Sequence, residues 1–217
     1  MNFNFSNLYY HYPVIAGLAI NHYALLTVVW NIFLVLIPLA LYFLLKRFRL
    51  KAQFFGWHRH LVAWLLLIVW LLFLPNAAYI ITDIRHLLDY CPVGSPDNVC
   101  PQNAWMIMFF FVYGAFGWVA FYYLLKAMAE LIKKIHNNFW SRLFTILTIP
   151  LVSLGVLLGL LNRYNSWEIF VFPLSLLKTV WLYFSQLNYF IDWFIFTIFL
   201  YFLYFAGEVI FKDNLKR

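Results

Sequence analysis

The stretch LVAWLLLIVWLLFLPNAAYIITDIRH, residues 61–86, decides how this chain folds. Its first half is an unbroken apolar run, and roughly 20 mostly apolar residues cross the hydrocarbon core of a bilayer as a helix. Its second half follows Pro75 and adds an amide, a carboxylate, a guanidinium and an imidazole within a few turns. The stretch therefore predicts a membrane-spanning helix that ends in a group of polar side chains.

The composition of the whole chain points the same way. Of the 217 residues, 65% are apolar, 23% are aromatic and only 11% are charged, whereas a soluble domain has roughly 45–50% apolar and about 25% charged residues. No water-soluble core needs so much apolar surface, so we expect the bilayer to be the solvent. The predicted fold class is all-α, a polytopic transmembrane helix bundle that forms one integral membrane domain, residues 1–217.

Five stretches are long and apolar enough to span the membrane. They cover about residues 23–45, 61–81, 104–125, 143–161 and 191–211. We expect Pro38 and Pro75 to kink the first two of these helices. Asn31 is an isolated amide in the first span, and we expect it to form a hydrogen bond to another helix.

Lys and Arg residues are distributed unevenly between the connections. Twelve of the fifteen lie in residues 46–60, 126–142 and 212–217. Because short loops rich in Lys and Arg stay in the cytoplasm, we expect a multi-pass protein of the bacterial cell membrane with its N-terminus outside and its C-terminus cytoplasmic. The net charge of +7 then reflects topology and contact with membrane lipid, and nucleic-acid binding is not expected.

The connection from Asn162 to Phe190 is too long for a turn and too apolar for a free loop. Pro173 suits the first turn of a helix, and the polar residues after it recur at helical spacing, with apolar residues on the other side. This pattern is typical of a helix that lies in the membrane interface. We place it at about residues 173–187 on the outer face, with a re-entrant segment or a sixth partial span as the alternatives.

Two pairs of residues each allow two interpretations. Gly155 and Gly159 form a G-x-x-x-G step, which lets helix backbones approach closely. The step favours packing within the bundle, and self-association through the same glycines is the alternative. Cys91 and Cys100 lie in an outer loop, where oxidising conditions permit a disulfide, and two free thiols are the alternative.

The polar residues after Pro75 share one face of a helix. At 100° per residue, the members of this face fall within an arc of about 80°. They are Asn76, Tyr79, Asp83, His86 and Tyr90. Polar groups at this depth normally face the bundle interior or a water-filled cavity, so we predict that they line one surface at the outer end of the bundle.

A second polar cluster ends the fourth span on the same side of the membrane. It contains Asn162, Arg163, Asn165, Ser166 and Glu168. A charge-assisted pair between Asp83 and Arg163 would join the two clusters, and His86 with Glu168 would form a second pair.

Three segments, WNIFLVLIP (residues 30–38), LPNAAYIITDIRHL (74–87) and NRYNSWEIF (162–170), follow one another over nearly the whole chain. In order and spacing they resemble the signature blocks of a bacterial membrane-protein family, domain of unknown function 1361. The family pattern has Pro or another small residue where Ala78 stands, and Asp where Glu168 stands, so the acid is kept. The resemblance implies a polytopic membrane protein and implies no reaction.

The first functional hypothesis is a membrane-embedded enzyme with its site at the extracytoplasmic face. Its candidate catalytic residues are Asp83, His86, Arg163 and Glu168, where His86 would act as acid or base and Arg163 would hold a phosphate or carboxylate. Asp83, His86 and Glu168 would alternatively ligate a divalent metal. A lipid headgroup or lipid-linked substrate suits this depth, and the candidate binding residues are Asn76, Tyr79, Tyr90, Asn165, Ser166 and Trp167.

Whether the protein is an enzyme stays open at this point. A non-catalytic accessory or binding subunit of a membrane complex is the second hypothesis, because the sequence contains no nucleophile constellation, Gly-rich phosphate loop or dense His cluster. The third is that the Asp83–Arg163 and His86–Glu168 pairs only tie helix ends together.

Overall fold

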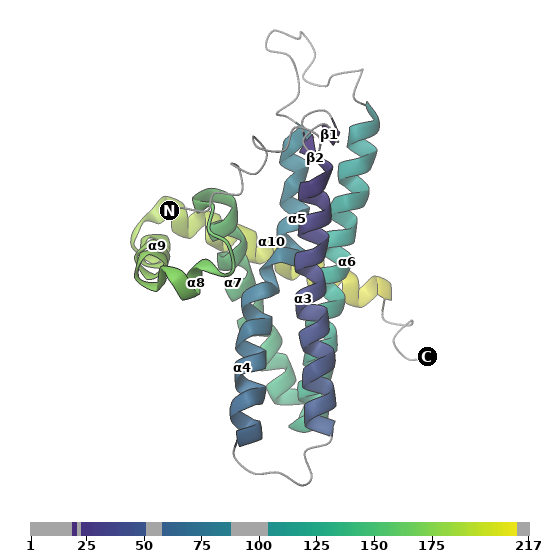
Figure 1. The fold of residues 1–217 in the computed structure, drawn as a ribbon, viewed down its shortest axis with the longest axis vertical. Coiled ribbons are helices and arrows are strands. Elements are labelled where there is room, and N and C mark those ends of the chain that lie inside the picture. The colour runs from purple at the N-terminus through teal and green to yellow at the C-terminus, as the bar shows by residue number, and fades with distance from the viewer. Residues whose placement is uncertain (1–18, 21–22, 51–57, 88–103, 212–217) are drawn as a thin grey trace.

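The computed structural model describes residues 19–20, 23–50, 58–87 and 104–211, which are almost entirely helical (Figure 1). Two short strands, β1 (Ala19–Ile20) and β2 (Tyr23–Ala24), pair antiparallel ahead of the first long helix. The helices are α3 (Leu25–Leu50), α4 (His58–Phe73), α5 (Pro75–Thr82), the 3-10 helix η2 (Asp83–Leu87), α6 (Ala104–Ile135), α7 (Asn138–Asn162), α8 (Glu168–Val171), α9 (Pro173–Ser185) and α10 (Leu187–Phe211). The predicted all-α fold class is confirmed.

Within the described residues, five helical stretches are long and apolar enough to cross a membrane. They are Leu25–Arg47, Leu61–His86, Trp105–Ile135, Asn138–Asn162 and Leu187–Phe211, and each coincides with one predicted span. α6 is longer than predicted, because the residues after Leu125, KAMAELIKK, are mostly strong helix formers.

The second span is broken at Pro75 into α4 and α5. Pro75 takes the first position of α5. A residue at this position has no intrahelical acceptor for an N–H group, so the N–H that proline lacks is not missed. The side chain of Asn76 donates from Nδ2 to the carbonyl of Phe73 at 2.9 Å, which satisfies a backbone acceptor at the break. The kink expected at Pro75 is confirmed, whereas α3 continues through Pro38 as one helix.

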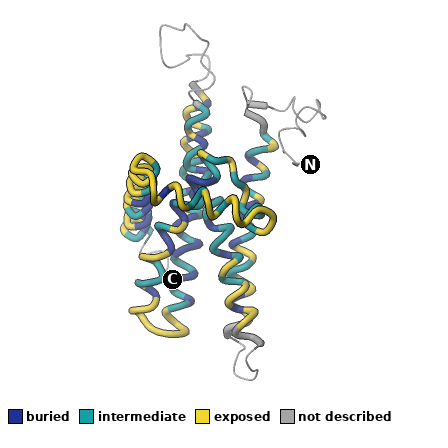
Figure 2. Tube along the Cα trace, turned by 90° about the vertical axis from the view of Figure 1, so that its left-hand side faces the viewer, coloured by how far each residue is buried: buried dark blue, intermediate teal, exposed yellow. Residues whose placement is uncertain are grey.

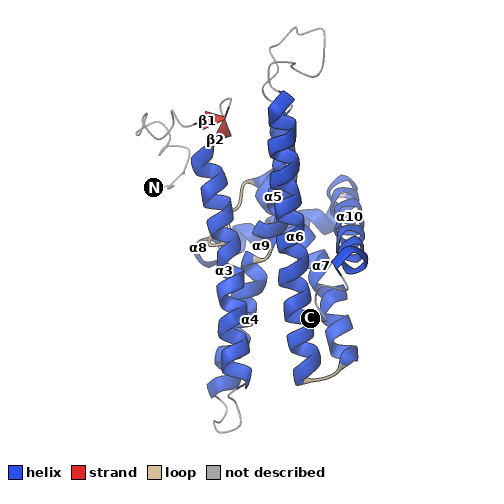
Figure 3. Ribbon diagram, turned by 90° about the vertical axis from the view of Figure 1, so that its right-hand side faces the viewer, coloured by secondary structure: helices blue, strands red, loops and turns tan. Residues whose placement is uncertain are grey.

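α3, α4 and α6 run along the long axis of the molecule (Figures 1 and 3). α5 contacts both α3 and α6, and it approaches α6 closely at Gly117, where an added Cβ would lie 2.8 Å from the Cβ of Ile80. α7 then turns back beside α6 after Asn137, whose Oδ1 accepts a hydrogen bond from Trp140 N at 3.0 Å and caps the helix.

The G-x-x-x-G step of α7 packs against α5. A Cβ at Gly155 would lie 2.6 Å from Cγ of Pro75, and a Cβ at Gly159 would lie 3.5 Å from the ring of Tyr79. Both glycines therefore serve packing within the bundle, which was the favoured interpretation of the step. Self-association through them stays a prediction.

α10 lies crosswise to the long helices instead of beside them (Figures 1 and 3). Pro150 of α7 has no N–H, so the carbonyl of Ile146, four residues earlier, loses its helical donor. The hydroxyl of Tyr201 in α10 donates to that carbonyl at 2.6 Å, and Nε1 of Trp193 donates to the carbonyl of Pro150 at 3.1 Å. The proline in α7 thus frees the Ile146 carbonyl, one of the two carbonyls to which α10 bonds where it crosses α7.

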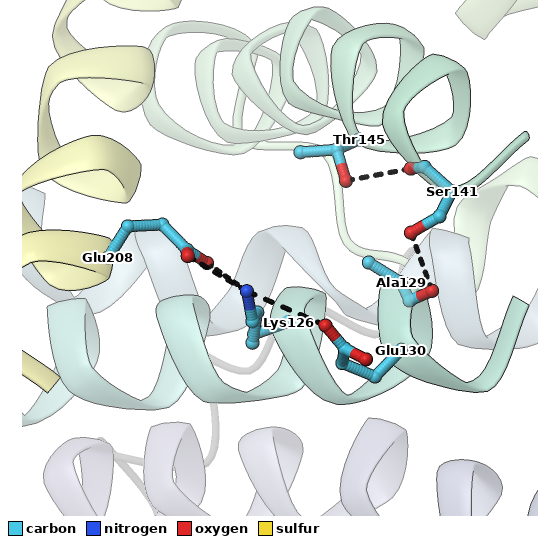
Figure 4. Close-up of polar contacts among 6 residues, drawn as sticks. All are labelled: Lys126, Ala129, Glu130, Ser141, Thr145 and Glu208. Carbon is cyan, nitrogen blue, oxygen red and sulfur yellow. Dashed lines mark hydrogen bonds and ion pairs between the residues drawn. The ribbon is translucent and has the colours of Figure 1, made fainter. Parts of the chain in front are cut away.

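α10 also crosses α6 through a close contact and an ion pair. A Cβ at Gly207 would lie 2.5 Å from the ring of Tyr122, so only glycine lets the two helices approach this closely. Nζ of Lys126 lies 2.7 Å and 2.8 Å from the two carboxylate oxygens of Glu208 and 3.7 Å from Oε1 of Glu130 (Figure 4). This ion pair joins residues 82 positions apart in the chain.

α9 begins at Pro173, as predicted, and follows the short helix α8. It lies at the side of the bundle, and its residues are mostly exposed (Figure 2). Tyr183 is its buried residue, and it packs with Leu157 and Leu158 of α7. Cys91 and Cys100 lie outside the described residues, so the disulfide stays a prediction.

Candidate functional site

The two predicted polar clusters lie toward the same end of the bundle, where α3, η2 and the α7–α8 connection meet. Nδ2 of Asn31 donates to Oδ2 of Asp83 at 3.0 Å across 52 residues. Asp83 is only 2% exposed and Asn31 is 9% exposed, so this hydrogen bond is formed away from solvent. The hydrogen bond expected of Asn31 is confirmed, and its partner is the carboxylate of the predicted polar face.

His86 lies one turn after Asp83 on the same side of η2. Its Nε2 is 4.0 Å from Oδ1 of Asp83, and its ring lies 6.4 Å from the ring of Phe110 in α6. About a fifth of the His86 side chain is exposed, whereas Asp83 is buried. The pair is therefore a buried carboxylate beside an imidazole that reaches the surface.

Asn76 and Tyr79 connect this face to α7 and to the residues that follow it. Nδ2 of Asn76 donates to Oγ of Ser166 at 3.0 Å, in addition to its bond to the α4 carbonyl. The ring of Tyr79 lies against Gly159. The structure thus brings Ser166 into contact with the predicted face, over 90 residues of sequence.

Two tryptophans bring α3 and the α7–α8 connection together. The rings of Trp30 and Trp167 lie 6.5 Å apart in an edge-to-face arrangement, a geometry that aromatic pairs favour. The segments 30–38, 74–87 and 162–170 therefore converge on one region of the fold.

Arg163 terminates α7 in the left-handed conformation, with φ 61° and ψ 26°. A backbone hydrogen bond from Tyr164 N to Leu158 O at 3.1 Å closes the end of the helix. Arg163 is exposed, and among the described residues it forms no ion pair with Asp83. The expected Asp83–Arg163 pair is thus absent from this structure: Oδ2 of Asp83 accepts a hydrogen bond from Asn31, and Arg163 lies exposed at the end of α7.

Glu168 takes part in a local cap. Its Oε2 accepts a hydrogen bond from Asn165 N at 2.9 Å, and its own N–H donates to Asn165 O at 3.0 Å. Asn165 and Glu168 therefore build the turn before α8, and no ion pair joins Glu168 to His86 within the described part of the chain.

The described residues do not supply a complete metal centre. No group of three His, Cys, Asp or Glu side chains among them is placed to share an ion, and catalytic zinc sites use three protein ligands. Asp83 and His86 are brought together, but Glu168 is bonded elsewhere. Tyr90 lies outside the described residues.

Arg85 lies within electrostatic range of Tyr79, which the helical pattern did not predict. An ideal α-helix places it away from the face of Asp83, but the chain tightens to a 3-10 helix at Asp83, which changes the side-chain directions. Its Nε is buried and has no hydrogen-bond partner among the residues that the structure describes. Arg85, Asp83 and Arg163 all lie within electrostatic range of Tyr79.

These features define a polytopic helical membrane protein in which a buried carboxylate lies beside an imidazole, with two guanidinium groups toward the same end of the bundle. The chain belongs to the family described as "Protein of unknown function (DUF1361)", whose family model matches residues 30–204. No curated protein and no solved structure gives a significant match to the chain.

Proposed function

We propose that the protein binds a phosphate-bearing lipid, either as a headgroup or as a lipid-linked substrate, at the cluster around Asp83, His86 and Arg163. The observation that carries the proposal is the pair of guanidinium groups there. Within the described part of the chain, neither Arg85 nor Arg163 forms an ion pair. Arg binds phosphate through parallel, charge-assisted N–H···O bonds, so two such groups favour an anion with several oxygens.

The remaining groups of the cluster suit the same ligand. Asn31 holds the Asp83 carboxylate in place, and Asp83 in turn lies beside Nε2 of His86. A histidine that is protonated in this position donates a hydrogen bond to a phosphate oxygen. Tyr79 lies within electrostatic range of both guanidinium groups, which places a phenol among the cations.

The position of the cluster favours an amphiphile over a soluble anion. Ile84, in the same 3-10 helix, is 48% exposed, and Phe170, after Glu168, is 66% exposed. The basic residues Lys133 and Lys134 belong to the far end of α6, and short basic segments stay cytoplasmic. The cluster would therefore meet the headgroup region on the extracytoplasmic side.

Arg163→Gly is the sharpest test, because it separates binding from folding. Glycine adopts the left-handed conformation without the cost of about 1–2 kcal/mol that a side chain incurs, so the variant should be at least as stable as the wild type. Binding is measured by calorimetry in detergent with short-chain phosphatidic acid, a short polyprenyl phosphate and the matching diacylglycerol. The first two probes distinguish a glycerolipid from a lipid-linked carrier, and the third lacks the phosphate.

We expect the wild type to bind at least one phosphate probe and to ignore the diacylglycerol. Arg163→Gly should lose that binding, whereas Arg142→Gln, at the other end of the same helix, should keep it. Equal binding by Arg163→Gly and wild type would overturn the proposal, as would equal binding of phosphate and diacylglycerol probes.

A membrane-embedded enzyme is the second candidate, and the Asp83–His86 pair is the observation that favours it. A buried carboxylate that is fixed by Asn31 would orient His86, which could then take a proton from water or from a substrate hydroxyl. Release of inorganic phosphate from the same probes tests this candidate. His86→Gln should abolish release and keep binding, and no release by the wild type would leave the protein as a binding module.

A further inference from the structure

The hydroxyl groups of α9 form a stripe that bonds to the rest of the protein. The hydroxyl of Tyr164 lies 2.9 Å from Oγ of Ser175 and 3.2 Å from Oγ1 of Thr179. One turn further on, the hydroxyl of Tyr183 donates to Oδ1 of Asn162 at 3.0 Å. Because these hydroxyls bond to the end of α7, α9 turns a different, apolar face away from the bundle.

That outward face forms a shallow groove. It has a volume of about 480 Å³ and is lined by Leu174, Leu177, Lys178, Trp181 and Leu182. The three most exposed of its apolar side chains, Leu174, Leu177 and Trp181, are 75%, 61% and 71% exposed. The ammonium group of Lys178 is therefore surrounded by apolar side chains.

Lys178 makes no hydrogen bond or ion pair with any residue that the structure describes. An ammonium group on a membrane-embedded apolar surface is costly unless an anion or water meets it. Lysine carries three donors on a flexible stem, so its Nζ can reach a phosphate at the headgroup level while the groove contacts hydrocarbon.

We propose that this groove binds one anionic phospholipid. The phospholipid phosphate accepts hydrogen bonds from Nζ of Lys178, and an acyl chain lies against Leu174, Leu177 and Trp181. This site is separate from the cluster at Arg163 and does not depend on the proposed function. The bound lipid would hold the outward face of α9, while the hydrogen bonds of the hydroxyl groups hold the face that packs on the bundle.

A second copy of the chain suits this groove less well. In a two-fold symmetric contact the same surface meets itself, and α9, PLSLLKTVWLYFS, contains no Asp or Glu to pair with Lys178 of the other copy. The lysines would meet each other or remain in hydrocarbon. An anionic lipid supplies the missing charge directly.

Native mass spectrometry of the delipidated full-length protein tests this inference. The protein is titrated with phosphatidylglycerol or with phosphatidylcholine of the same acyl chains, and the bound copies are counted. At the α9 site, wild type should hold a tight phosphatidylglycerol that Lys178→Gln binds about fivefold more weakly, since one basic residue near an anionic headgroup contributes roughly that factor. Lys178→Arg should restore binding.

Three variants make the outcome specific. Lys134→Gln, which removes another exposed lysine, should match wild type, and Trp181→Ala should bind both lipids more weakly while keeping the preference for phosphatidylglycerol. Arg163→Gly should retain this lipid even if it loses the phosphate probes. Equal phosphatidylglycerol binding by wild type and Lys178→Gln, or equal loss in Lys134→Gln, would overturn the site on α9.

Discussion

At one end of the bundle Asn31 of α3 meets Asp83 of η2, and at the crossing of α6 and α10 Lys126 meets Glu208. Both contacts join helices that are far apart in the sequence. Asp83 receives a hydrogen bond from a neutral amide and is nearly inaccessible, whereas Glu208 is held by an ammonium group through both of its oxygens.

The difference separates a structural pair from a candidate binding site. Lys126 is matched by Glu208, with Glu130 close by, so the charges at the α6–α10 crossing compensate one another. Near Asp83, by contrast, the described part of the chain contains two guanidinium groups, Arg85 and Arg163, that form no ion pair. Self-compensating charges hold helices together, and cations without an ion-pair partner among the described residues are the candidates for binding a ligand.

The largest effect is expected at the α6–α10 crossing. Lys126→Met leaves Glu208 without its cation in apolar surroundings, and breaking such a pair from one side costs about 3 kcal/mol where it is well buried. Because 21% of the Lys126 side chain and 28% of the Glu208 side chain are exposed, the loss should fall toward about 2 kcal/mol. Thermal unfolding in detergent measures it.

The double variant Lys126→Met with Glu208→Met is the control. Replacing both partners removes the uncompensated charge, so we expect most of the lost stability to return, while binding of the phosphate probes stays unchanged throughout. If the single and double variants are equally destabilised, the pair does not tie α10 to α6.

At the other region, Asn31→Leu removes the amide that holds Asp83. A buried carboxylate that loses a hydrogen bond costs about 1–3 kcal/mol, so the variant should be less stable by about 2 kcal/mol and should also bind the phosphate probes more weakly. Asp83→Asn keeps the shape of the side chain and removes its charge. It therefore separates the effect on stability from the effect on probe binding. Loss of stability in Asn31→Leu with unchanged probe binding would make this region structural, like the α6–α10 crossing.

Much of the fold follows from side-chain patterns. The five candidate spans follow from the lengths of the apolar runs, and Pro173 marks the start of α9. Pro75 marks the break of the second span because proline cannot continue the hydrogen bonding of a helix. The shared face of Asn76, Tyr79 and Asp83 follows from helical spacing.

Other features depend on tertiary structure and could not be predicted. α10 is apolar on all sides, so no periodic face indicates that it crosses α7 at Pro150. Residues Asp83–Leu87 form a 3-10 helix instead of the ideal α-helix that the spacing assumes, and Arg163 ends α7 in the left-handed conformation. Local geometry thus decided which predicted site residues meet.

A third experiment tests the contact between α5 and α7, which positions the site residues of α5. Gly155→Ala would place a methyl group 2.6 Å from Cγ of Pro75, whereas Gly159→Ala would meet the Tyr79 ring at an ordinary 3.5 Å. Overpacking of this kind costs about 1–3 kcal/mol. We expect Gly155→Ala to lower the stability of the monomer by about 1.5 kcal/mol and Gly159→Ala to change it little.

Sedimentation in detergent distinguishes packing within the chain from self-association. If the glycines serve the α5–α7 contact, neither substitution changes the mass of the particle. A shift from dimer to monomer in both variants, without loss of stability, would assign the step to a homodimer instead.

The smallest expected effect lies at the buried end of α9. Burial raises the pKa of Tyr183 to about 12 from the usual 10, with smaller contributions from Tyr189 and Asp192. The neutral phenol is therefore favoured in the folded state, and its stabilisation is fully present below pH 10 and lost as the pH rises toward 12. Tyr183→Phe removes both this titration and the hydrogen bond to Asn162.

We expect Tyr183→Phe to be less stable than wild type by about 1 kcal/mol at neutral pH, the usual value of one hydrogen bond. The difference between the two proteins should shrink above pH 10, because only the wild type then loses the neutral phenol. Unfolding midpoints across this range measure the change, with Tyr189→Phe as the matched control. Equal stability of the two proteins at every pH would mean that Tyr183 contributes packing alone, and α9 would then be held mainly by the apolar contacts of its inner face.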